Sequence, residues 1–495
     1  MCGLVFAHGP NAETIVKAGL KKIAYRGPDE QKILNEGETC MGFVRLAIND
    51  QSDASMQPHE YGSLLGMFNA EIYNHAELKE TLDCTPSSGS DTNVILPLFA
   101  QNRRILLQKL DGFFSGVIYD QQKRKLFTIR DLLGKKPLFL VKTGQNLVVT
   151  SELKSCSKID GFQIIPRGIC EIDLQAGSIL QNNKNSQPYV PNKTILLWDA
   201  MVSAVNKRIP AFPPTKYAVF LSGGLDSSII ASLVHRSTAS KNARYYYFDN
   251  DNSEDTKYAR EILEYLQIPN NQIKAVPTPQ DSEIGQLISD VVYHTESYNP
   301  SIISNGIGTY ILSKYARHDD IKVALGGDGA DEVFCGYFDH GPDDDWQTQR
   351  HQLLNDLHTT ELRRIDGAAM AHSIEVRCPF LDRDVIHISD KLNYADLYGS
   401  ASKGYQRKKI LRVTFSDILP VEVSQRPKVS FDRGTGIQEQ VINYCKAQNL
   451  NEQEYLKQVW RKHSAPSLSS WEDTPYFHSY PAFDKFIQSR ARKYE

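Results

Sequence analysis

The sequence has 495 residues. This exceeds the size at which single hydrophobic cores usually stop growing, so we expect at least two domains. Its 56 basic and 59 acidic residues give a formal net charge of -3, which excludes a global electrostatic footprint for nucleic acid and a polybasic membrane patch. No apolar run approaches the roughly 18 residues of a membrane span, and the N-terminus lacks the pattern of a signal peptide.

Cys2 is the first residue of chemical interest, because it follows the initiator Met and precedes Gly3. Loss of Met would place the thiol beside its own α-amine, which can serve as a base for a nucleophile. Taken alone, Cys2 is more simply explained as a small residue that starts a strand. The eight cysteines form no CxxC pair and no regular framework, so reduced thiols in a cytoplasmic protein are the simplest interpretation.

Before the middle of the chain, short β-type runs alternate with turn signals. Two intervening segments, Ala76–Leu82 and Asp91–Ala100, have helical patterns. We therefore expect antiparallel, β-rich layers with a few helices, and a first domain over residues 1–190. The polar stretch Gln181–Asn192, with clustered Asn and two prolines, is typical of an exposed linker.

After the linker, apolar runs lead into glycine turns and helices. Tyr217–Leu221 is followed by Gly-rich residues and by a helical pattern at Ser227–Val234. A second run, Ile321–Leu325, also feeds a Gly-rich loop, and from about residue 350 the pattern is mostly helical. This texture indicates a parallel α/β sheet with ligands at the carboxyl ends of its strands. We place this second domain at residues 195–495.

The first Gly-rich loop has the composition of a nucleotide site. Glycines let the backbone approach phosphate oxygens, and a helix N-terminus offers free N–H groups. No Gly-Lys-Ser/Thr follows, so it is not a Walker A loop. A plain capped turn is the alternative, but the strand before it and the helix after it favour phosphate binding. The expected ATP or pyrophosphate contacts are Leu221, Ser222, Gly223, Gly224, Asp226 and Ser227.

A second loop, Leu325–Glu332, carries three acidic side chains in five residues. A solvated loop is the alternative, but beside the first loop it is better explained as a further contact for pyrophosphate, at Gly327, and for Mg²⁺. We expect Asp226 and Asp331 to hold the metal, which offsets charge that develops during adenylation. The two loops resemble those of N-type ATP pyrophosphatases, which adenylate a substrate and release pyrophosphate.

Motifs along most of the chain resemble a single family. The first group is similar to the class II (N-terminal nucleophile) glutamine amidotransferase domain. It comprises Met1–Gly3, Tyr25–Asp29, Arg45–Ile48, Phe68–Asn74, Ser90–Thr92, Arg130–Asp131, Gly134–Leu138 and Ser151–Lys154. Followed by the ATP loop and by Ile365–Asp382, the order resembles that of glutamine-hydrolysing asparagine synthetases. The resemblance fades only after about residue 440.

The resemblance implies an α/β protein of two domains. The first would be an Ntn-hydrolase-like αββα sandwich of antiparallel sheets. The second would be a parallel-sheet, adenine-nucleotide α-hydrolase-like (PP-loop ATPase) domain with added helices. The cofactors would be ATP and Mg²⁺, and the partners would be glutamine, ATP and aspartate or another carboxylate. No nucleic acid or membrane partner is expected, and a homodimer is compatible with the family.

For the glutamine half, the resemblance implies roles by position. Cys2 would be the nucleophile on the side-chain amide of glutamine. The Asn69 side-chain amide and the backbone N–H of Ala70 would form the oxyanion hole. The family usually has Gly at position 70, and a Cβ there would clash if the backbone needs a positive φ or a close substrate approach. We therefore expect glutaminase activity to survive at a reduced rate.

The rest of the glutamine site is expected to bind the amino-acid end of the substrate. Arg45 would bind the α-carboxylate, because a planar guanidinium matches a carboxylate. Glu71 and Asp91 would meet the α-amino group.

In the synthetase half, the resemblance implies catalytic roles for Asp328 and Lys428, with Lys428 stabilising charge during adenylation and amide formation. Lys428 precedes the Gly-rich stretch Phe431–Gly436, which we expect to be a folded active-site flap. Lys408 is expected to be structural or a phosphate contact. Glu375 and Arg377 are expected to form a buried pair.

The acceptor stays open at this stage. Gly367, Ala368 and Ala369 depart from the family pattern near the expected acceptor site, which puts aspartate specificity in doubt. The leading hypothesis is aspartate to asparagine through an acyl-adenylate. The alternatives are amide or lactam formation on a specialised carboxylate, and an impaired regulatory homologue. Intact Cys2 and Asp328 argue against lactam closure.

Overall fold

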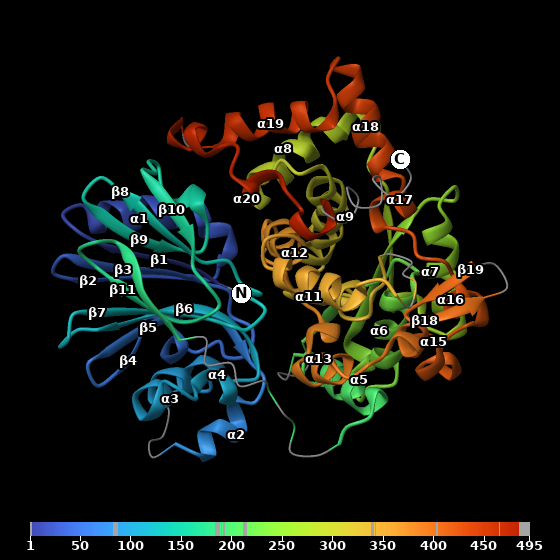
Figure 1. Cartoon of the computed structure of the whole chain (residues 1–495), viewed down its shortest axis with the longest axis horizontal. Helices are drawn as coiled ribbons and strands as arrows, with labels where there is room; N and C mark the ends of the chain where they lie inside the picture. The colour runs from blue at the N-terminus through green and yellow to red at the C-terminus, as the bar shows by residue number, and fades with distance from the viewer. Residues whose placement is uncertain are drawn as a thin grey trace. The chain divides into compact units, whose positions relative to one another are not determined.

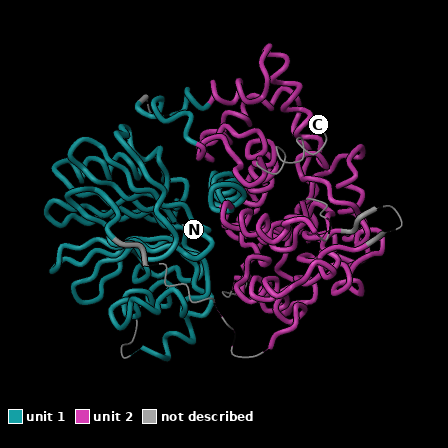
Figure 2. Tube along the Cα trace, viewed as in Figure 1, with its two compact units in different colours: residues 1–188, 357–373, 460–474 teal, residues 189–356, 374–459, 475–495 magenta. Residues whose placement is uncertain are grey.

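A computed structural model describes residues 2–484, apart from 83–87, 184–188, 190, 192–193, 211–214, 338–340, 342, 402–403 and 465. The chain forms two compact units (Figures 1 and 2). Unit 1 consists of residues 1–188, 357–373 and 460–474, and unit 2 consists of residues 189–356, 374–459 and 475–495. After its first 188 residues, the chain therefore returns twice to unit 1.

Unit 1 contains two six-stranded sheets in which all neighbouring strands are antiparallel. In spatial order, the first sheet consists of β10 (Gly161–Ile164), β8 (Phe139–Thr143), β9 (Asn146–Thr150), β1 (Gly3–His8), β3 (Thr39–Arg45) and β2 (Glu30–Glu36). The second consists of β12 (Ser178–Asn183), β11 (Gly168–Asp173), β7 (Lys125–Arg130), β6 (Gly112–Asp120), β5 (Leu64–Ile72) and β4 (His59–Tyr61).

Apolar side chains pack the two sheets against each other and pack helices on their outer faces. Between the sheets, buried side chains such as Phe6, Phe43 and Met67 form one core. The other face of the second sheet packs on helices through a separate core. On the first sheet, Gly42 leaves room for α1, because a Cβ at Gly42 would lie 2.4 Å from Val16. The order helix, sheet, sheet, helix confirms the predicted αββα sandwich of antiparallel sheets.

The helices of unit 1 are short. They are α1 (Ala12–Ile23), α2 (His75–Glu80), α3 (Ile95–Asn102), α4 (Leu106–Lys109) and α12 (Glu361–Met370), with 3-10 turns at Ala24–Arg26, Asp53–Ser55, Asp91–Val94, Leu153–Ser155 and Pro466–Trp471. The predicted helix Asp91–Ala100 is therefore two elements, a 3-10 turn and α3. The predicted linker begins too early, because Gln181–Asn183 belong to β12, which pairs with β11. Residues 184–188, 190 and 192–193 of that linker lie outside the described residues.

Unit 2 is built on a five-stranded parallel sheet, as predicted. In spatial order the strands are β15 (Ile273–Pro277), β14 (Ala243–Asp249), β13 (Tyr217–Phe220), β16 (Val323–Leu325) and β17 (Glu375–Arg377). The chain starts at β13, adds strands on one side, and then crosses to β16 on the other side. The order therefore reverses between β13 and β16, and such a switch point is where open α/β sheets bind ligands.

Helices and one hairpin complete unit 2. The hairpin is β18 (Tyr398–Ala401) with β19 (Gly404–Arg407). The helices are α5 (Leu197–Asn206), α6 (Leu225–His235), α7 (Glu254–Tyr265), α8 (Ile284–Thr295), α9 (Pro300–His318), α10 (Ala330–Val333), α11 (Trp346–Asp356), α13 (Arg383–Ser389), α14 (Tyr394–Leu397), α15 (Lys409–Thr414), α16 (Val421–Gln425), α17 (Phe431–Thr435), α18 (Ile437–Ala447) and α20 (Pro475–His478). A further helix, α19 (Glu452–His463), begins in unit 2 and ends in unit 1. Turns of 3-10 type lie at Ser240–Asn242, Asn270–Gln272, Asp281–Glu283, Pro379–Leu381 and Ser416–Ile418.

Local sequence explains several of these helix boundaries. The Ser253 side chain caps α7 by accepting from Thr256 N, and Asn299 caps α9 ahead of Pro300. The Gly-rich stretch Phe431–Gly436, expected to be a flap loop, instead forms the short helix α17, and Gly436 follows its last residue with a φ of 83°. In the part of the chain that the structure describes, we find no helix with the length and apolar content needed to traverse a bilayer.

Candidate functional site

Cys2 lies at the start of β1, the central strand whose neighbours are β9 and β3. Its side chain is half-buried, and its backbone N donates to Asn69 Oδ1 at 3.1 Å. Gly3 allows the chain to pack closely against Val44 and Arg26, because a Cβ there would lie 2.9 Å from Val44 Cγ2 and 3.3 Å from Arg26 Cδ. The sequence therefore packs the first residues of the chain tightly between a strand and the turn after α1.

Asn69 stands on β5 and is fully buried. Its Oδ1 is engaged by Cys2, while its Nδ2 has no hydrogen-bond partner among the described residues. A buried amide N–H₂ without a partner is costly, unless a ligand oxygen satisfies it. The oxyanion role of Asn69 stays a prediction, and this geometry favours it.

Ala70 is the departure that we expected to slow the glutamine site. It pairs with Phe114 within the β5–β6 ladder, and its φ is not among the positive values. Its methyl group packs against the core under α2–α4. Successive side chains of a strand point to opposite faces, so the Ala70 methyl points away from the face that carries Asn69. The backbone strain that we considered at this position is therefore absent.

The residues expected to hold the amino-acid end of glutamine are all buried and already engaged. Arg45 Nη1 donates to Glu30 Oε2 at 2.8 Å and to Ser52 O at 3.1 Å. Glu71 Oε1 accepts from Asn49 Nδ2 at 2.6 Å, and Asp91 Oδ2 accepts from Ile72 N at 2.7 Å. A substrate carboxylate at Arg45 would thus share the guanidinium with Glu30 or displace it.

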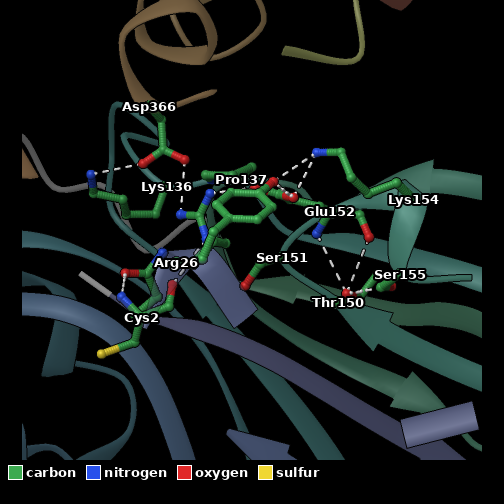
Figure 3. Close-up of polar contacts among 12 residues, drawn as sticks. Cys2, Arg26, Lys136, Pro137, Thr150, Ser151, Glu152, Lys154, Ser155 and Asp366 are labelled. Atoms are coloured by element: carbon green, nitrogen blue, oxygen red, sulfur yellow. Dashed lines mark hydrogen bonds and ion pairs between the residues drawn. The ribbon is translucent and has the colours of Figure 1, made fainter. Parts of the chain in front are cut away.

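Beside Cys2 lies a set of mostly buried polar and charged side chains, here named the Arg26 cluster (Figure 3). Its members are Tyr25, Arg26, Lys136, Glu152, Lys154 and Asp366. Burial alone would raise the pKa of Glu152, but Lys154 and Arg26 lower it to about 2. All six residues lie within the motifs described above, yet sequence reasoning gave them no role. Charged and polar residues that recur in these motifs were the available signal.

In unit 2, two loops meet at the switch point between β13 and β16. The first follows β13, turns at Gly223 with a φ of 67°, and opens α6. Ser222 Oγ and Ser227 Oγ are 3.0 Å apart and tie this loop together. Gly327 of the second loop lies directly against it, because a Cβ at Gly327 would lie 2.8 Å from Ser227 N. The predicted loop residues are therefore brought together.

The carboxylates of the two loops are joined by two lysines, which we call the lysine–carboxylate cluster. Lys408 Nζ lies 2.6 Å from both Asp226 Oδ2 and Asp331 Oδ1. Lys428 Nζ lies 2.6 Å from Asp331 Oδ2 and 4.0 Å from Asp226 Oδ2. Burial alone would raise the pKa of Asp331, but Lys408 and Lys428 hold it far below its usual range. Sequence reasoning placed Lys428 here and left Lys408 between a structural role and a phosphate contact.

Gly336 leaves space for the side chains of this cluster. A Cβ at Gly336 would lie 2.1 Å from Lys408 Cε, so a larger residue there would push the lysine out of its place. Arg426 supports the first loop by donating to Ser222 O at 3.3 Å, and its guanidinium also pairs with Asp255. Burial raises the pKa of Asp255 to about 6 in spite of Arg426. Arg426 thus connects a buried carboxylate to the phosphate loop.

The other predicted residues fall as follows. Glu375 Oε1 and Arg377 Nε are 2.6 Å apart and both side chains are 1% exposed, so the predicted buried pair is confirmed. Asp328 is half-buried. Its Oδ2 lies close to Gly326, since a Cβ at Gly326 would be only 2.7 Å away. Leu221 is buried, and its N–H donates to Tyr246 O at 2.9 Å, which fixes the start of the loop.

Asp226 and Asp331 are the residues that would hold Mg²⁺. Among the described residues, no group of three or more His, Cys, Asp or Glu is arranged to hold a metal ion. Two carboxylates suffice for Mg²⁺ that arrives with phosphates, because this ion keeps several waters and takes ligands from the substrate. Asp226 Oδ1 is buried and without a hydrogen-bond partner in the described chain, as expected of an oxygen that awaits a cation.

Comparison with known proteins agrees with this division. The model described as "Glutamine amidotransferase domain" matches residues 1–172, and the model described as "Asparagine synthase" matches residues 197–354 and 339–473. Thus the chain joins an amidotransferase domain to a synthase domain in one polypeptide. It belongs to the asparagine synthase family, among the glutamine-hydrolysing enzymes.

Relatives from distant sources resemble the chain over most of its length. A probable glutamine-hydrolysing asparagine synthetase of Schizosaccharomyces pombe is 30% identical over 88% of this chain and 85% of its own. An asparagine synthetase of Brassica oleracea is 29% identical over 88% of this chain and 78% of its own. A probable asparagine synthetase of Acanthamoeba polyphaga mimivirus is 28% identical over 92% of this chain and 89% of its own.

Proposed function

We propose that the chain makes asparagine from aspartate, with glutamine as nitrogen donor and ATP as the activating substrate. The products are asparagine, glutamate, AMP and pyrophosphate. The observation that carries the proposal is the pairing of two sites in one chain. One site has a thiol next to an unpartnered amide donor, and the other has two glycine-hinged loops with two carboxylates at a sheet switch point.

In unit 1, Cys2 Sγ would attack the side-chain carbonyl carbon of glutamine. The Asn69 amide and the backbone N–H of Ala70 would stabilise the negative charge on the oxygen, and such donors are worth about 3 kcal/mol each. The C–N bond breaks, ammonia leaves, and water then cleaves the thioester to give glutamate. Arg45, Glu71 and Asp91 would orient the substrate through its charged end.

In unit 2, a carboxylate oxygen of aspartate would attack the α-phosphorus of ATP, and the bond from this phosphorus to the bridging oxygen breaks, releasing pyrophosphate. Adenylation is needed because a carboxylate is a poor electrophile. The loop residues Ser222–Ser227 and Gly327 would bind the pyrophosphate, and Lys428 would offset charge on the phosphates. Ammonia then attacks the acyl carbon, the bond to AMP breaks, and the amide forms.

Mg²⁺ is part of this proposal, held by Asp226 and Asp331. When bound with ATP, it would neutralise charge on the α- and β-phosphates. Lys408 and Lys428, which contact these carboxylates, are placed to take over phosphate contacts. Asp328 stands at the same loop and is proposed to act close to the reacting carboxylate.

A different acceptor is the second candidate, and a specific observation favours keeping it. By the family resemblance, Gly367, Ala368 and Ala369 stand where larger residues are usual near the acceptor, and they lie in α12, where Ala368 and Ala369 are fully buried. The acceptor could then be a carboxylic acid other than aspartate, with the same adenylation chemistry.

The test is a substrate panel with mass identification of the product. Purified protein is supplied with ATP, Mg²⁺, glutamine or ammonium, and one carboxylic acid at a time. We expect AMP, pyrophosphate, glutamate and asparagine in equal amounts with aspartate. Release of AMP only with another acid would reassign the acceptor. Failure to split ATP between its α- and β-phosphates with any acid would refute the proposal.

A further inference from the structure

Arg26 is a second residue, besides Asn69, that holds the main chain of Cys2. Its Nε donates to Cys2 O at 3.1 Å, and its guanidinium is fully buried. Figure 3 shows the sulfur of Cys2 pointing away from Arg26. Arg26 therefore acts on the backbone of the nucleophile and leaves the thiol to face the substrate.

Two carboxylates orient this guanidinium. Nη1 donates to Glu152 Oε1 at 2.6 Å, and Nη2 lies 2.9 Å from Asp366 Oδ2. Each terminal nitrogen thus has its own carboxylate, and Nε is aimed at Cys2 as a consequence. Burial alone would lower the pKa of Arg26, but Asp366 and Glu152 raise it above its ordinary value.

Asp366 differs from Glu152 in origin, because it comes from α12, some 340 residues after Arg26. Its second oxygen accepts from Lys136 Nζ at 3.0 Å, and that ammonium lies 4.5 Å from the centroid of the Phe113 ring. Beyond α12, Ser373 Oγ donates to Tyr25 O at 2.6 Å, one residue before Arg26. The segment of α12 and the residues just after it is therefore bound both to Arg26, through Asp366, and to the preceding residue Tyr25, through Ser373.

Charge accounting shows what Asp366 does for Arg26. The Arg26 cluster holds three cations, Arg26, Lys136 and Lys154, and two carboxylates, Glu152 and Asp366. Without the Asp366 charge, three buried cations would face a single carboxylate. A buried charge that loses its partner is strongly unfavourable, so Arg26 would move toward Glu152 or water. Its hydrogen bond to Cys2 O would then be lost.

We propose that Asp366 is a positioning residue for glutamine hydrolysis: it holds Arg26 against the carbonyl of Cys2, and so fixes the nucleophile. This inference rests on the proposed role of Cys2. A nucleophile held by one contact instead of two samples orientations that do not react, and small misplacements of reacting groups cost up to about a hundredfold in rate. The helix that supplies Asp366 leads through residues 371–374 into β17, so the glutamine site is completed by a segment within the synthase match.

The test compares two variants of the full chain that break the same ion pair. Asp366→Asn removes the negative charge that faces both Arg26 and Lys136. Lys136→Met removes only the lysine and leaves the Asp366 carboxylate paired with Arg26. We expect Asp366→Asn to lower kcat for glutamine hydrolysis by roughly ten- to a hundredfold with KM within about threefold, because Asp366 touches none of the glutamine-binding residues. Lys136→Met should change kcat by less than about threefold. Alkylation of Cys2 by iodoacetamide, followed by peptide mass spectrometry, should slow in parallel with kcat.

Ammonium-dependent amide synthesis is the folding control, and it should stay within about twofold in both variants. Equal losses of kcat in the two variants, or an unchanged kcat in Asp366→Asn, would overturn the inference. Should Asp366→Asn also lose ammonium-dependent synthesis, Arg26→Lys takes its place. Lysine keeps the charge but has no equivalent of Nε, so the same loss supports the inference and an unchanged kcat refutes it. A wild-type protein that releases no glutamate would refute the proposed function instead.

Discussion

The Arg26 cluster of unit 1 and the lysine–carboxylate cluster of unit 2 are both buried networks of Lys, Arg, Asp and Glu, yet they differ in how they are closed. In the first, both terminal nitrogens of Arg26 and both oxygens of Asp366 lie within 3.0 Å of an oppositely charged side chain, although Arg26 Nη2 and Asp366 Oδ2 meet as an ion pair without hydrogen-bond geometry. In the second, Lys428 is 30% exposed and Asp226 Oδ1 has no hydrogen-bond partner in the described chain.

This difference indicates how each network is used. Closed networks fix geometry, because the full desolvation cost of each charge is offset only in one arrangement. Networks with an open oxygen and a partly exposed cation can exchange partners with a ligand at lower cost. We therefore expect changes in unit 2 to abolish ligand chemistry, and changes around Arg26 to alter rates and stability.

The largest effect is expected from Asp226→Ala. This change removes the unpartnered oxygen and one anchor of Lys408, so the nucleotide cannot be bound for adenylation. Amide synthesis with glutamine and with ammonium should both fall by at least about a hundredfold. Pyrophosphate release measures this, and glutamine hydrolysis by unit 1 is the control. Amide synthesis at the wild-type rate would contradict the role of Asp226.

Cys2→Ala should abolish synthesis with glutamine and spare synthesis with ammonium. Without the thiol, no thioester can form, so glutamine-dependent synthesis should be lost, whereas ammonium-dependent synthesis should persist within about twofold. Product formation with each nitrogen source, at saturating ATP, separates the two. Glutamine-dependent product at the wild-type level would show that the nucleophile lies elsewhere.

Asn69→Ala should produce an intermediate loss. It deletes the buried amide donor and also the acceptor of Cys2 N. The kcat for glutamine hydrolysis should fall by about 10²–10³-fold, which corresponds to about 3–4 kcal/mol. Steady-state glutamate release measures the loss. A change confined to KM would indicate that Asn69 binds the substrate and does not stabilise the oxyanion.

Glu152→Gln should show that the Arg26 cluster contributes to the free energy of unfolding in a pH-dependent way. Since the folded pKa of Glu152 is lowered to about 2, its contribution is present above the unfolded pKa and is lost as pH falls from about 4.5 toward 2. At pH 7 the variant should be less stable by about 3 kcal/mol. The difference between the urea unfolding midpoints of the two proteins should be nearly the same at pH 7 and pH 5 and clearly smaller at pH 3, because the contribution is lost fully only below the folded pKa. A constant difference would show that the carboxylate charge is not the cause.

The smallest effect is expected from Ala70→Gly, although this position departs from the family pattern. The Ala70 methyl packs into the core away from Asn69, so its removal should change kcat/KM for glutamine by less than about threefold. It should lower stability by about 1 kcal/mol, because glycine weakens a strand interior. A tenfold gain in kcat/KM would show that the methyl obstructs the substrate.

Local patterns in the sequence predicted much of this molecule. The strand, glycine turn and helix around Ser222 are set by neighbouring residues, and the structure places that loop where the pattern indicates. The alternation of short β-runs likewise predicted antiparallel, β-rich layers, while the sandwich of two sheets was implied by the family resemblance. The helix at Asp91 was only partly predicted, because its first turn is of 3-10 type and the switch depends on tertiary packing.

Contacts between distant parts of the chain could not be predicted in this way. The Arg26–Asp366 pair and the Ser373–Tyr25 hydrogen bond join residues about 340 positions apart, and no local signal specifies such a pairing. The engagement of Arg45 with Glu30 was missed for a different reason, because the two residues are cross-strand partners of β3 and β2 and sequence reasoning did not set the register of these strands. A resemblance indicates which residues matter, but partners within the fold depend on how the segments come together.

The return of residues 357–373 to unit 1 also has a practical consequence for dissecting the protein. Met370 covers Leu46 and Phe113 in a small apolar cluster. A fragment cut at the end of the first 188 residues would expose these side chains to water and leave Arg26 without Asp366. Such a fragment should aggregate or hydrolyse glutamine poorly, and supplying a peptide of residues 357–373 in trans is the natural attempt to restore it.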